Sequence, residues 1–503
     1  MASRTDLSTP ADTRFFGHPR GLATLFFTEM WERFSYYGMR AILIFYLTHK
    51  LTEGGLGFSD EKAGAIYGLY ASMVYLLCLG GGWVADRITG QRRAVLIGGV
   101  FIAVGEFCLV VPSETSFYIG LVLLMMGTGM LKGNVSTIVG QIYPKGDPRR
   151  DSGFSLFYMG INLGALISPL ICGYVGERIS WRMGFGVAGL GMLLGVVQYV
   201  LGGKYLGDAG LHPPSTGDLA KDRRQKRNAI FAVGSGLGVF ALLALAGVAG
   251  IIQFTATSIA DLEGWALLGI SVAVFSWMIF SRGWTLEERK RSAAILVLFV
   301  ASALFWASFE QAGSSLSLFA ERSTDRNIFG FVFPASWFQF VQPIFVVVLA
   351  PVFAWLWLAL RRRGREPSSP AKFSYGLFFA GAAFAILVPA AMIAEPHGHP
   401  ATQVALWWLI GTYFLQTLGE LSLSPVGLSA MTKLAPDRAA GFVMGIWFLS
   451  TSIGNWLAGK AASLYSAMPL PTLFGSVAAF TFGAMVLLVL LIRPTVRLMS
   501  GVK

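Results

Sequence analysis

The densest group of ionisable side chains inside an apolar stretch of this chain occurs near its start. Glu29, Glu32, Arg33, Tyr36 and Tyr37 fall within nine residues. In a helix, spacings of three, four and seven residues place Glu29, Glu32, Arg33 and Tyr36 on one face. Two acids, one base and two phenols exceed what a buried ion pair needs to lock helices together. This face can bind a charged solute and exchange a proton, so it predicts a polar cavity.

Further charges interrupt apolar stretches later in the chain, among them Lys132, Glu310 and Glu420. A charge within hydrocarbon costs at least roughly 2.5–3.5 kcal/mol on insertion scales, so each one needs a partner or a function. The cation lies in the first half of the chain and the two acids lie in the second. Corresponding helices of two pseudo-repeated halves would therefore present opposite charges to a shared site at the midplane. That polarity suits a zwitterion whose charges are separated.

The composition requires that these residues lie in a membrane. The chain has 503 residues, of which 54% are apolar and 13% charged, and its mean hydropathy is +0.62. A soluble domain carries roughly 25% charged residues. The net charge of +12 comes from short basic blocks between apolar stretches, which is typical of membrane topology and predicts no nucleic-acid partner. Cys78, Cys108 and Cys172 lack CxxC spacing, so they imply neither a disulfide framework nor a zinc site. We expect no metal and no cofactor.

A membrane span needs about 20 apolar residues, and this length predicts fourteen transmembrane helices. They run near 22–48, 63–85, 94–112, 117–143, 154–176, 182–201, 229–252, 264–281, 293–319, 333–360, 373–394, 402–432, 439–465 and 470–492. Alternate loops hold 29 and 7 basic residues, and Arg33, Arg40 and Lys132 lie inside spans. Because basic loops stay in the cytoplasm, both termini are predicted to be cytoplasmic.

The fourteen spans divide as six, two and six. The spans at 229–252 and 264–281 contain no Lys, Arg, Asp or Glu, so we expect them to be peripheral. The predicted organisation is an N-terminal six-helix bundle, a basic cytoplasmic linker, an inserted helix pair and a C-terminal six-helix bundle. These occupy residues 1–203, 204–228, 229–285 and 286–503, respectively.

The loop after the second span carries Asp86 and Arg87, followed by Gly90 and two more arginines. An acid at a helix end followed by basic residues can pair across a helix joint and hold one conformer shut. This pattern is typical of transporters of the major facilitator type.

The stretch from Glu29 to Gly38 resembles the ExxERFxYYG signature of the proton-coupled oligopeptide transporters, members of the major facilitator superfamily. Further stretches similar to that family occur in the same order along nearly the whole chain, at 70–75, 84–87, 157–164, 306–311, 420–429 and 441–447. The resemblance implies an all-α major facilitator fold and proton-driven uptake of di- and tripeptides, with protons as the coupling ion. The inserted helix pair resembles the one in bacterial members.

The resemblance also implies roles for individual residues. Arg33 and Lys132 would hold the peptide carboxylate, and Glu420, helped by Asn162, would hold the amino terminus. Glu29 and Glu32 would take part in proton coupling, and Glu310 would exchange partners with Arg33 or Lys132. The remaining expected substrate contacts are Tyr36, Tyr37, Tyr70, Trp306, Gln342, Ser424 and Trp447. Gripping the two termini leaves the side chains free to vary, which favours broad selectivity.

Three positions depart from the family pattern. Gly133 stands where many members have proline, and Gln342 stands where many have asparagine, so we expect a similar amide contact from a longer arm. The second span lacks the histidine that some animal members use, so coupling must rest on carboxylates.

Other functions fit less well. A same-fold transporter of nitrate would have no use for Glu420 opposite Lys132, although export or an unusual substrate stays possible. An enzyme needs a nucleophile–base pair or a metal cluster, and no span provides one. A receptor that had lost transport would have lost Glu29, Glu32 or Arg33. We therefore expect a non-enzymatic symporter with a monomeric functional unit, in the inner membrane of a bacterium.

Overall fold

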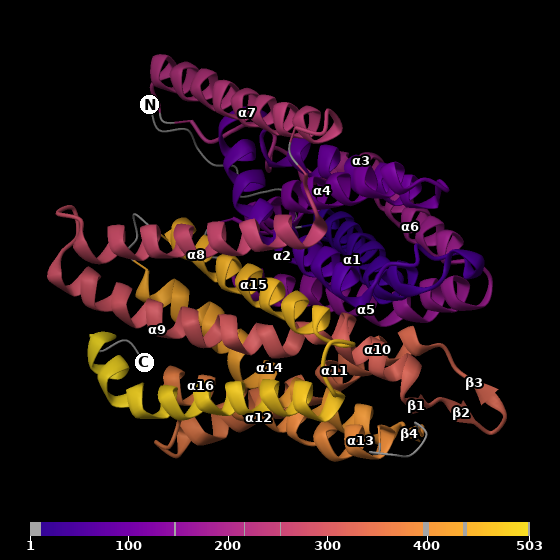
Figure 1. Ribbon diagram of the computed structural model, residues 1–503. Helices are drawn as coiled ribbons and strands as arrows, with labels where there is room; N and C mark the ends of the chain where they lie inside the picture. Colours follow the sequence, from indigo (N-terminus) through magenta and orange to yellow (C-terminus); the bar gives the residue numbers. More distant parts are fainter. Residues whose placement is uncertain are drawn as a thin grey trace.

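The computed structural model describes residues 12–144, 147–215, 217–251, 253–395, 402–435 and 440–500. Long α-helices form most of this part of the chain (Figure 1). In the first half these are α1 (Arg20–Thr48), α2 (Asp60–Val84), α3 (Gln91–Val110), α4 (Glu114–Gln141), α5 (Arg150–Arg178), α6 (Trp181–Gly202), α7 (Leu219–Val248) and α8 (Ala256–Phe280). In the second half they are α9 (Leu286–Phe309), α10 (Ser315–Arg322), α11 (Phe338–Arg362), α12 (Ser369–Ala385), α13 (Leu387–Ala394), α14 (Trp407–Leu434), α15 (Ala440–Ser463) and α16 (Leu470–Leu498).

Each of the fourteen predicted spans coincides with one helical segment, which confirms the all-α membrane fold. Two of these segments are broken: α9 and α10 are joined by a 3-10 turn, η4 (Glu310–Gly313), and α12 is followed directly by α13. Among the described residues, 11 helical segments are long and apolar enough to cross a membrane. The segments formed by α1, α14 and α15 are not among these eleven. Helix α1 carries four ionisable residues of the predicted cavity and its neighbourhood, namely Glu29, Glu32, Arg33 and Arg40.

Short polar side chains begin several helices. Ser59 and Ser113 accept hydrogen bonds from the backbone N–H groups three residues later, at the starts of α2 and α4. Thr285 and Glu288 form a reciprocal capping box at the start of α9. These caps satisfy N–H groups that a helix start otherwise leaves unpaired. They position α2, α4 and α9, which carry residues at or near the predicted cavity.

The helices form two bundles, α1–α6 and α9–α16, with the inserted helices at their margin (Figure 1). Helix α7 is largely exposed and lies along the edge of the first bundle. It begins at Leu219, so the basic run 221–227, expected in a loop, forms its first turns. Helix α8 packs against α2, α9 and α15. It starts earlier than predicted and so includes Asp261 and Glu263, the latter 4% exposed; the expectation that this helix carries no charge was therefore wrong, whereas it does lie at the margin of the bundles.

Helices α2 and α15 bring the two bundles into their closest contact. A methyl group added at Gly68 would lie 2.7 Å from the Cα atom of Gly459, so only glycine permits this approach. One turn further along α2, the hydroxyls of Ser72 and Ser452 lie 2.9 Å apart. Small residues therefore allow the two backbones to meet.

Replacing Gly68 by leucine should force these helices apart, lower the free energy of unfolding by about 1–3 kcal/mol and abolish transport. Thermal unfolding in detergent and substrate uptake into proteoliposomes would measure both effects. Gly80→Leu is the matched control, because a Cβ atom at Gly80 meets nothing within 4 Å. Equal behaviour of the two variants would show that the close contact is dispensable.

Short strands cover one end of the molecule. Strand β1 (Thr324–Asp325) pairs in parallel with β4 (Val404–Ala405). Strands β2 (Asn327–Ile328) and β3 (Phe331–Val332) form an antiparallel hairpin. Phe329 and Gly330 have φ values of 52° and 88° at its turn, as a two-residue type I′ loop requires. This hairpin and the end of α1 at Thr48 lie at the same end of the bundles, where the inter-bundle contacts described below gather.

Candidate functional site

The predicted acidic and basic cluster on α1 is assembled and buried. Arg33 donates from Nη2 to Oε1 of Glu32 at 2.6 Å and also contacts Oε2 of Glu32 through Nε. Oε1 of Glu29 lies 3.5 Å from Nε of Arg33. The guanidinium lies 4.8 Å from the ring centre of Tyr36. Two carboxylates thus share one guanidinium.

The second oxygen of Glu29, Oε2, is buried without a hydrogen-bond partner in the described part of the chain. A buried, ionised carboxylate with an unpaired oxygen is costly, because that oxygen has lost its water without gaining a hydrogen-bond partner. Glu32, by contrast, has both oxygens bound to Arg33. The geometry therefore distinguishes the two acids: Glu32 binds Arg33 through both carboxylate oxygens, and Glu29 contacts it through one.

A second ion pair joins the two bundles at the centre of the molecule. Nη2 of Arg40 on α1 lies 2.6 Å from Oε2 of Glu310 in η4, and both side chains are nearly fully buried. Nε of Arg40 donates to the hydroxyl of Tyr67 at 2.7 Å. No role was predicted for Arg40, and Arg33 or Lys132 was the expected partner of Glu310. One signal was present, since Arg40 lies seven residues after Arg33 and so on the same face of α1.

A cavity lies beside this ion pair, between the bundles. Its lining includes six of the predicted site residues: Tyr37, Asn162, Trp306, Glu310, Gln342 and Glu420. It also includes three charged or phenolic residues that were not predicted, namely Arg40, Tyr75 and Tyr158. Both halves of the chain contribute charge, with Arg40 from the first bundle and Glu310 and Glu420 from the second. The cavity can therefore receive a solute that carries both charges.

Two polar residues of this lining orient their neighbours. The amide of Gln342 donates to Oε2 of Glu420 at 3.3 Å, an amide contact of the kind predicted for this position. Asn162 donates to the backbone carbonyl of Tyr158 at 3.0 Å. Glu420 thus keeps one oxygen free of this contact and available to a ligand in the cavity.

The other predicted residues lie close by in the packed interior. Lys132 places its Nζ 4.1 Å from the ring centre of Tyr75, which lines the cavity. Tyr36 stacks on Tyr70 with ring centres 6.5 Å apart. Trp447 is buried, and a Cβ atom on Gly427 would lie 2.3 Å from its ring. Ser424 is half-buried on α14, one turn after Glu420.

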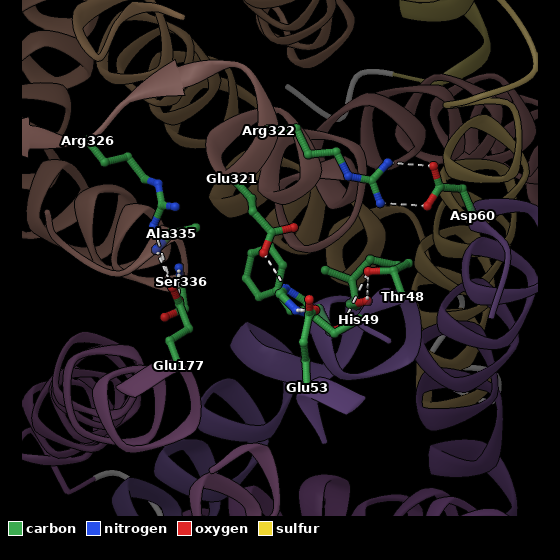
Figure 2. A network of polar contacts seen from close by, with 12 residues as sticks. Thr48, His49, Glu53, Asp60, Glu177, Glu321, Arg322, Arg326, Ala335 and Ser336 are labelled. Carbon is green, nitrogen blue, oxygen red and sulfur yellow. Dashed lines mark hydrogen bonds and ion pairs between the residues drawn. The ribbon is translucent and has the colours of Figure 1, made fainter. Parts of the chain in front are cut away.

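The two bundles are held together at the end where α1 finishes (Figure 2). Arg322 donates to both carboxylate oxygens of Asp60, at 2.6 and 2.8 Å. His49 lies between two acids, 2.6 Å from Oε1 of Glu321 and 2.9 Å from Oε2 of Glu53. Glu177 accepts hydrogen bonds from the backbone N–H groups of Ala335 and Ser336, at 2.8 and 2.7 Å. We call these contacts the end lock.

The end lock should depend on pH through His49. The hydrogen bond to Glu321 is the main cause that raises the pKa of His49 above its ordinary value of about 6.5. Protonated His49 therefore stabilises the closed end. This stabilisation is complete below the ordinary pKa and is lost as the pH rises through the raised pKa. Over that range the ratio of closed to open molecules should fall by at most about tenfold per pH unit.

In His49→Gln the closed population should no longer change over that pH range. Double electron–electron resonance between spin labels at Thr52 and Ala467, in a variant lacking the three cysteines, would measure the opening. His212→Gln is the control, since His212 lies in the loop after α6. An unchanged pH dependence in His49→Gln would assign the effect to another group.

The expected conformational latch at Asp86 and Arg87 lies at the opposite end of α2, in a π-helical turn. Asp86 accepts a hydrogen bond from the amide of Gln91 at 2.8 Å. The guanidinium of Arg87 lies 5.1 Å from the ring centre of Trp83. Both contacts stay within the first bundle. Buried Glu106 likewise has a local partner, the hydroxyl of Ser35 at 2.9 Å.

Comparison with known proteins agrees with this architecture. Residues 92–475 match the POT family. The transporter YclF of Bacillus subtilis is 43% identical over 492 residues, covering 97% of this chain and 96% of the relative. The peptide transporter YePEPT of Yersinia enterocolitica is 39% identical over 513 residues, covering 99% and 98%. A crystal structure of the peptide transporter POT with sulfate superposes with a TM-score of 0.90 at 41% identity, covering 98% of each chain. The chain belongs to the POT family of transporters.

Proposed function

We propose that this protein is a proton-driven symporter that imports di- and tripeptides across the bacterial inner membrane by alternating access. The observation that carries the proposal is the cavity between the bundles, whose first-bundle wall carries a cation and whose second-bundle wall carries Glu310 and Glu420. The termini are the only charges that every dipeptide shares. A similarity to a protein named a peptide transporter supports this substrate class.

The substrate carboxylate would bind on the side of Arg33, Arg40 and Lys132, and its amino group would bind Glu420. A carboxylate that approaches Arg40 competes with Glu310 for the same guanidinium, so substrate binding would loosen the contact between the bundles. Tyr37, Tyr75 and Tyr158 offer phenol groups to the peptide backbone. The side chains would lie toward Trp306, which constrains them little.

In this proposal the structure represents the inward-facing state. The predicted topology places the end lock at the periplasmic surface, because α1 starts in the cytoplasm. The polar contacts between the bundles gather in that half, through Asp60, His49, Glu177 and Ser72. Opening would break the end lock and separate α2 from α15, while closing the other end. The single chain would be the transport unit, because both walls of the cavity belong to it.

Proton coupling would use the two acids that share Arg33. Protonation of Glu29 removes one of the two carboxylates that hold Arg33. Arg33 then keeps Glu32 as its partner and can accept the substrate carboxylate in place of Glu29. Release of the peptide would restore the pairing of Glu29 with Arg33 and expel the proton. Proton and peptide would thus leave in one linked event.

Uptake of labelled dialanine into proteoliposomes, with and without an inward proton gradient, tests the proposal. We expect accumulation only with the gradient, blocked by an unlabelled tripeptide and unaffected by a free amino acid. Folded protein that takes up no dialanine in either condition would assign the cavity to another substrate class.

A further inference from the structure

A second binding feature lies outside the transport cavity, on the outer surface of the first bundle. The start of α1, the end of α6 and the following 3-10 turn η3 (Gly203–Leu206) enclose a groove of about 870 Å³. This volume lies in the range of small-molecule sites. From this observation we propose that the groove binds an anionic phospholipid of the cytoplasmic leaflet.

The end of the groove beside the start of α1 and η3 is basic. Arg14, Arg20 and Lys204 line it. Arg20 and Lys204 both approach the ring of Tyr205, with the Arg20 guanidinium carbon 5.3 Å and the Lys204 Nζ 5.2 Å from its centre. Two cations held against one aromatic ring favour an anion between or above them.

A neighbouring carboxylate, that of Asp12, partly balances these cations. Asp12 lies beside them, and its two oxygens accept hydrogen bonds from the backbone N–H groups of Arg14 and Arg20, at 3.3 and 2.9 Å. Among the described residues, none of the three basic side chains forms a salt bridge within 4 Å. The groove therefore keeps an excess of positive charge.

The other end of the groove, formed by α6 and the part of α1 near Trp31, is apolar and faces outward. Leu194, Val197 and Leu201 follow one face of α6 at helical spacing and are 54%, 48% and 69% exposed. Trp31 from α1 lines the same part. Exposed aliphatic side chains on a membrane helix face acyl chains, so this wall would contact a lipid tail.

The floor of the groove is the contact between α1 and α6, where small residues let the two helices pack closely. A Cβ atom on Gly202 would lie 2.4 Å from the hydroxyl oxygen of Thr24, so α6 meets α1 through a glycine here. Thr28 donates to the side-chain oxygen of Gln198 at 3.3 Å, and Gln198 donates to the carbonyl of Thr24 at 3.3 Å. These bonds join the two helices and leave small Ala23 at the groove.

The order of these parts matches one class of ligand. Cations at the polar end and an aliphatic wall below them follow the order of headgroup and tail in an anionic phospholipid, and basic pockets between helices on the cytoplasmic side suit such headgroups. A free anion would have no use for the aliphatic wall. Because Trp31 adjoins Glu32 in α1, a bound lipid would also brace the helix that carries the predicted proton-coupling residues.

Native mass spectrometry of the full chain, with phosphatidylglycerol or phosphatidylcholine added, tests this proposal. We expect one selectively retained phosphatidylglycerol and a higher unfolding temperature with that lipid, because a ligand of the folded state stabilises it. The triple variant R14Q/R20Q/K204Q should bind this lipid about a hundredfold more weakly, since each basic group contributes roughly a fivefold factor near an anionic lipid surface.

The controls separate the site from general charge attraction. R362Q/R363Q/R365Q removes the same charge from the exposed end of α11 and the loop that follows, and should leave lipid binding unchanged. Ala23→Phe should block the groove while keeping every cation, and so should abolish retention of the lipid. Equal losses in both triple variants, or normal retention in Ala23→Phe, would overturn the proposal. Stabilisation by inorganic phosphate equal to that by the lipid would assign the groove to a free anion and would also overturn it.

Discussion

Replacing Glu32 by glutamine is expected to abolish proton-driven accumulation of dialanine while leaving peptide counterflow measurable. Glu32 binds Arg33 through both carboxylate oxygens, and Glu29 contributes a longer contact of 3.5 Å. Glutamine keeps the shape of the side chain but loses the charge. Glu29 then becomes the only carboxylate partner of Arg33 within this cluster and must remain ionised to balance it. Glu29 could then no longer accept the coupling proton, while the cavity between the bundles would remain intact.

Proteoliposomes allow both activities to be measured on the same preparation. Accumulation under an inward proton gradient should fall to the level of protein-free liposomes, and exchange of labelled for unlabelled dialanine should persist without a gradient. Glu61→Gln is the control, because Glu61 is an exposed carboxylate at the start of α2. Intact driven uptake in Glu32→Gln would remove Glu32 from the coupling mechanism.

The second large effect is expected from Arg40→Gln. This change leaves Glu310 buried without its cation, and removing one partner of a buried pair typically costs about 3–5 kcal/mol. We therefore expect a much lower unfolding temperature and no peptide uptake. The double variant Arg40→Gln/Glu310→Gln removes both charges, so it should recover most of the stability. Its uptake should remain absent, because the charges are needed for binding and opening.

An exposed ion pair of similar length provides the comparison. Arg361 lies 2.7 Å from Glu366 and its side chain is 67% exposed, against 8% for Arg40. Exposed pairs contribute about 0–1 kcal/mol, so Arg361→Gln should change the unfolding temperature little. These expectations are tested by the unfolding temperatures, in the same detergent, of the unchanged protein, Arg40→Gln, the double variant and Arg361→Gln. Equal losses for Arg40→Gln and Arg361→Gln, or failure of the double variant to recover, would contradict the stabilising role of the central pair.

The spans and the position of the charged cluster on α1 could be predicted from the sequence alone. Insertion into a membrane depends on the local concentration of apolar residues, so hydropathy and segment length located all fourteen helical segments. The helical repeat placed Glu29, Glu32 and Arg33 on one face because their spacing is local. The same repeat would have added Arg40, seven residues after Arg33, had that spacing been followed one turn further.

The pairing of distant charges could not be predicted from the sequence, because it depends on how the helices pack. Glu310 and Arg40 are separated by 270 positions in the chain, and no local pattern identifies their pairing. The same holds for Asp60 with Arg322 and His49 with Glu321, which hold one end of the bundles together. Glu263 is buried only because α8 lies against α2 and α15, a contact that hydropathy does not encode. Local composition decides whether a segment enters the membrane, whereas the pairing of distant charges depends on how the finished helices pack.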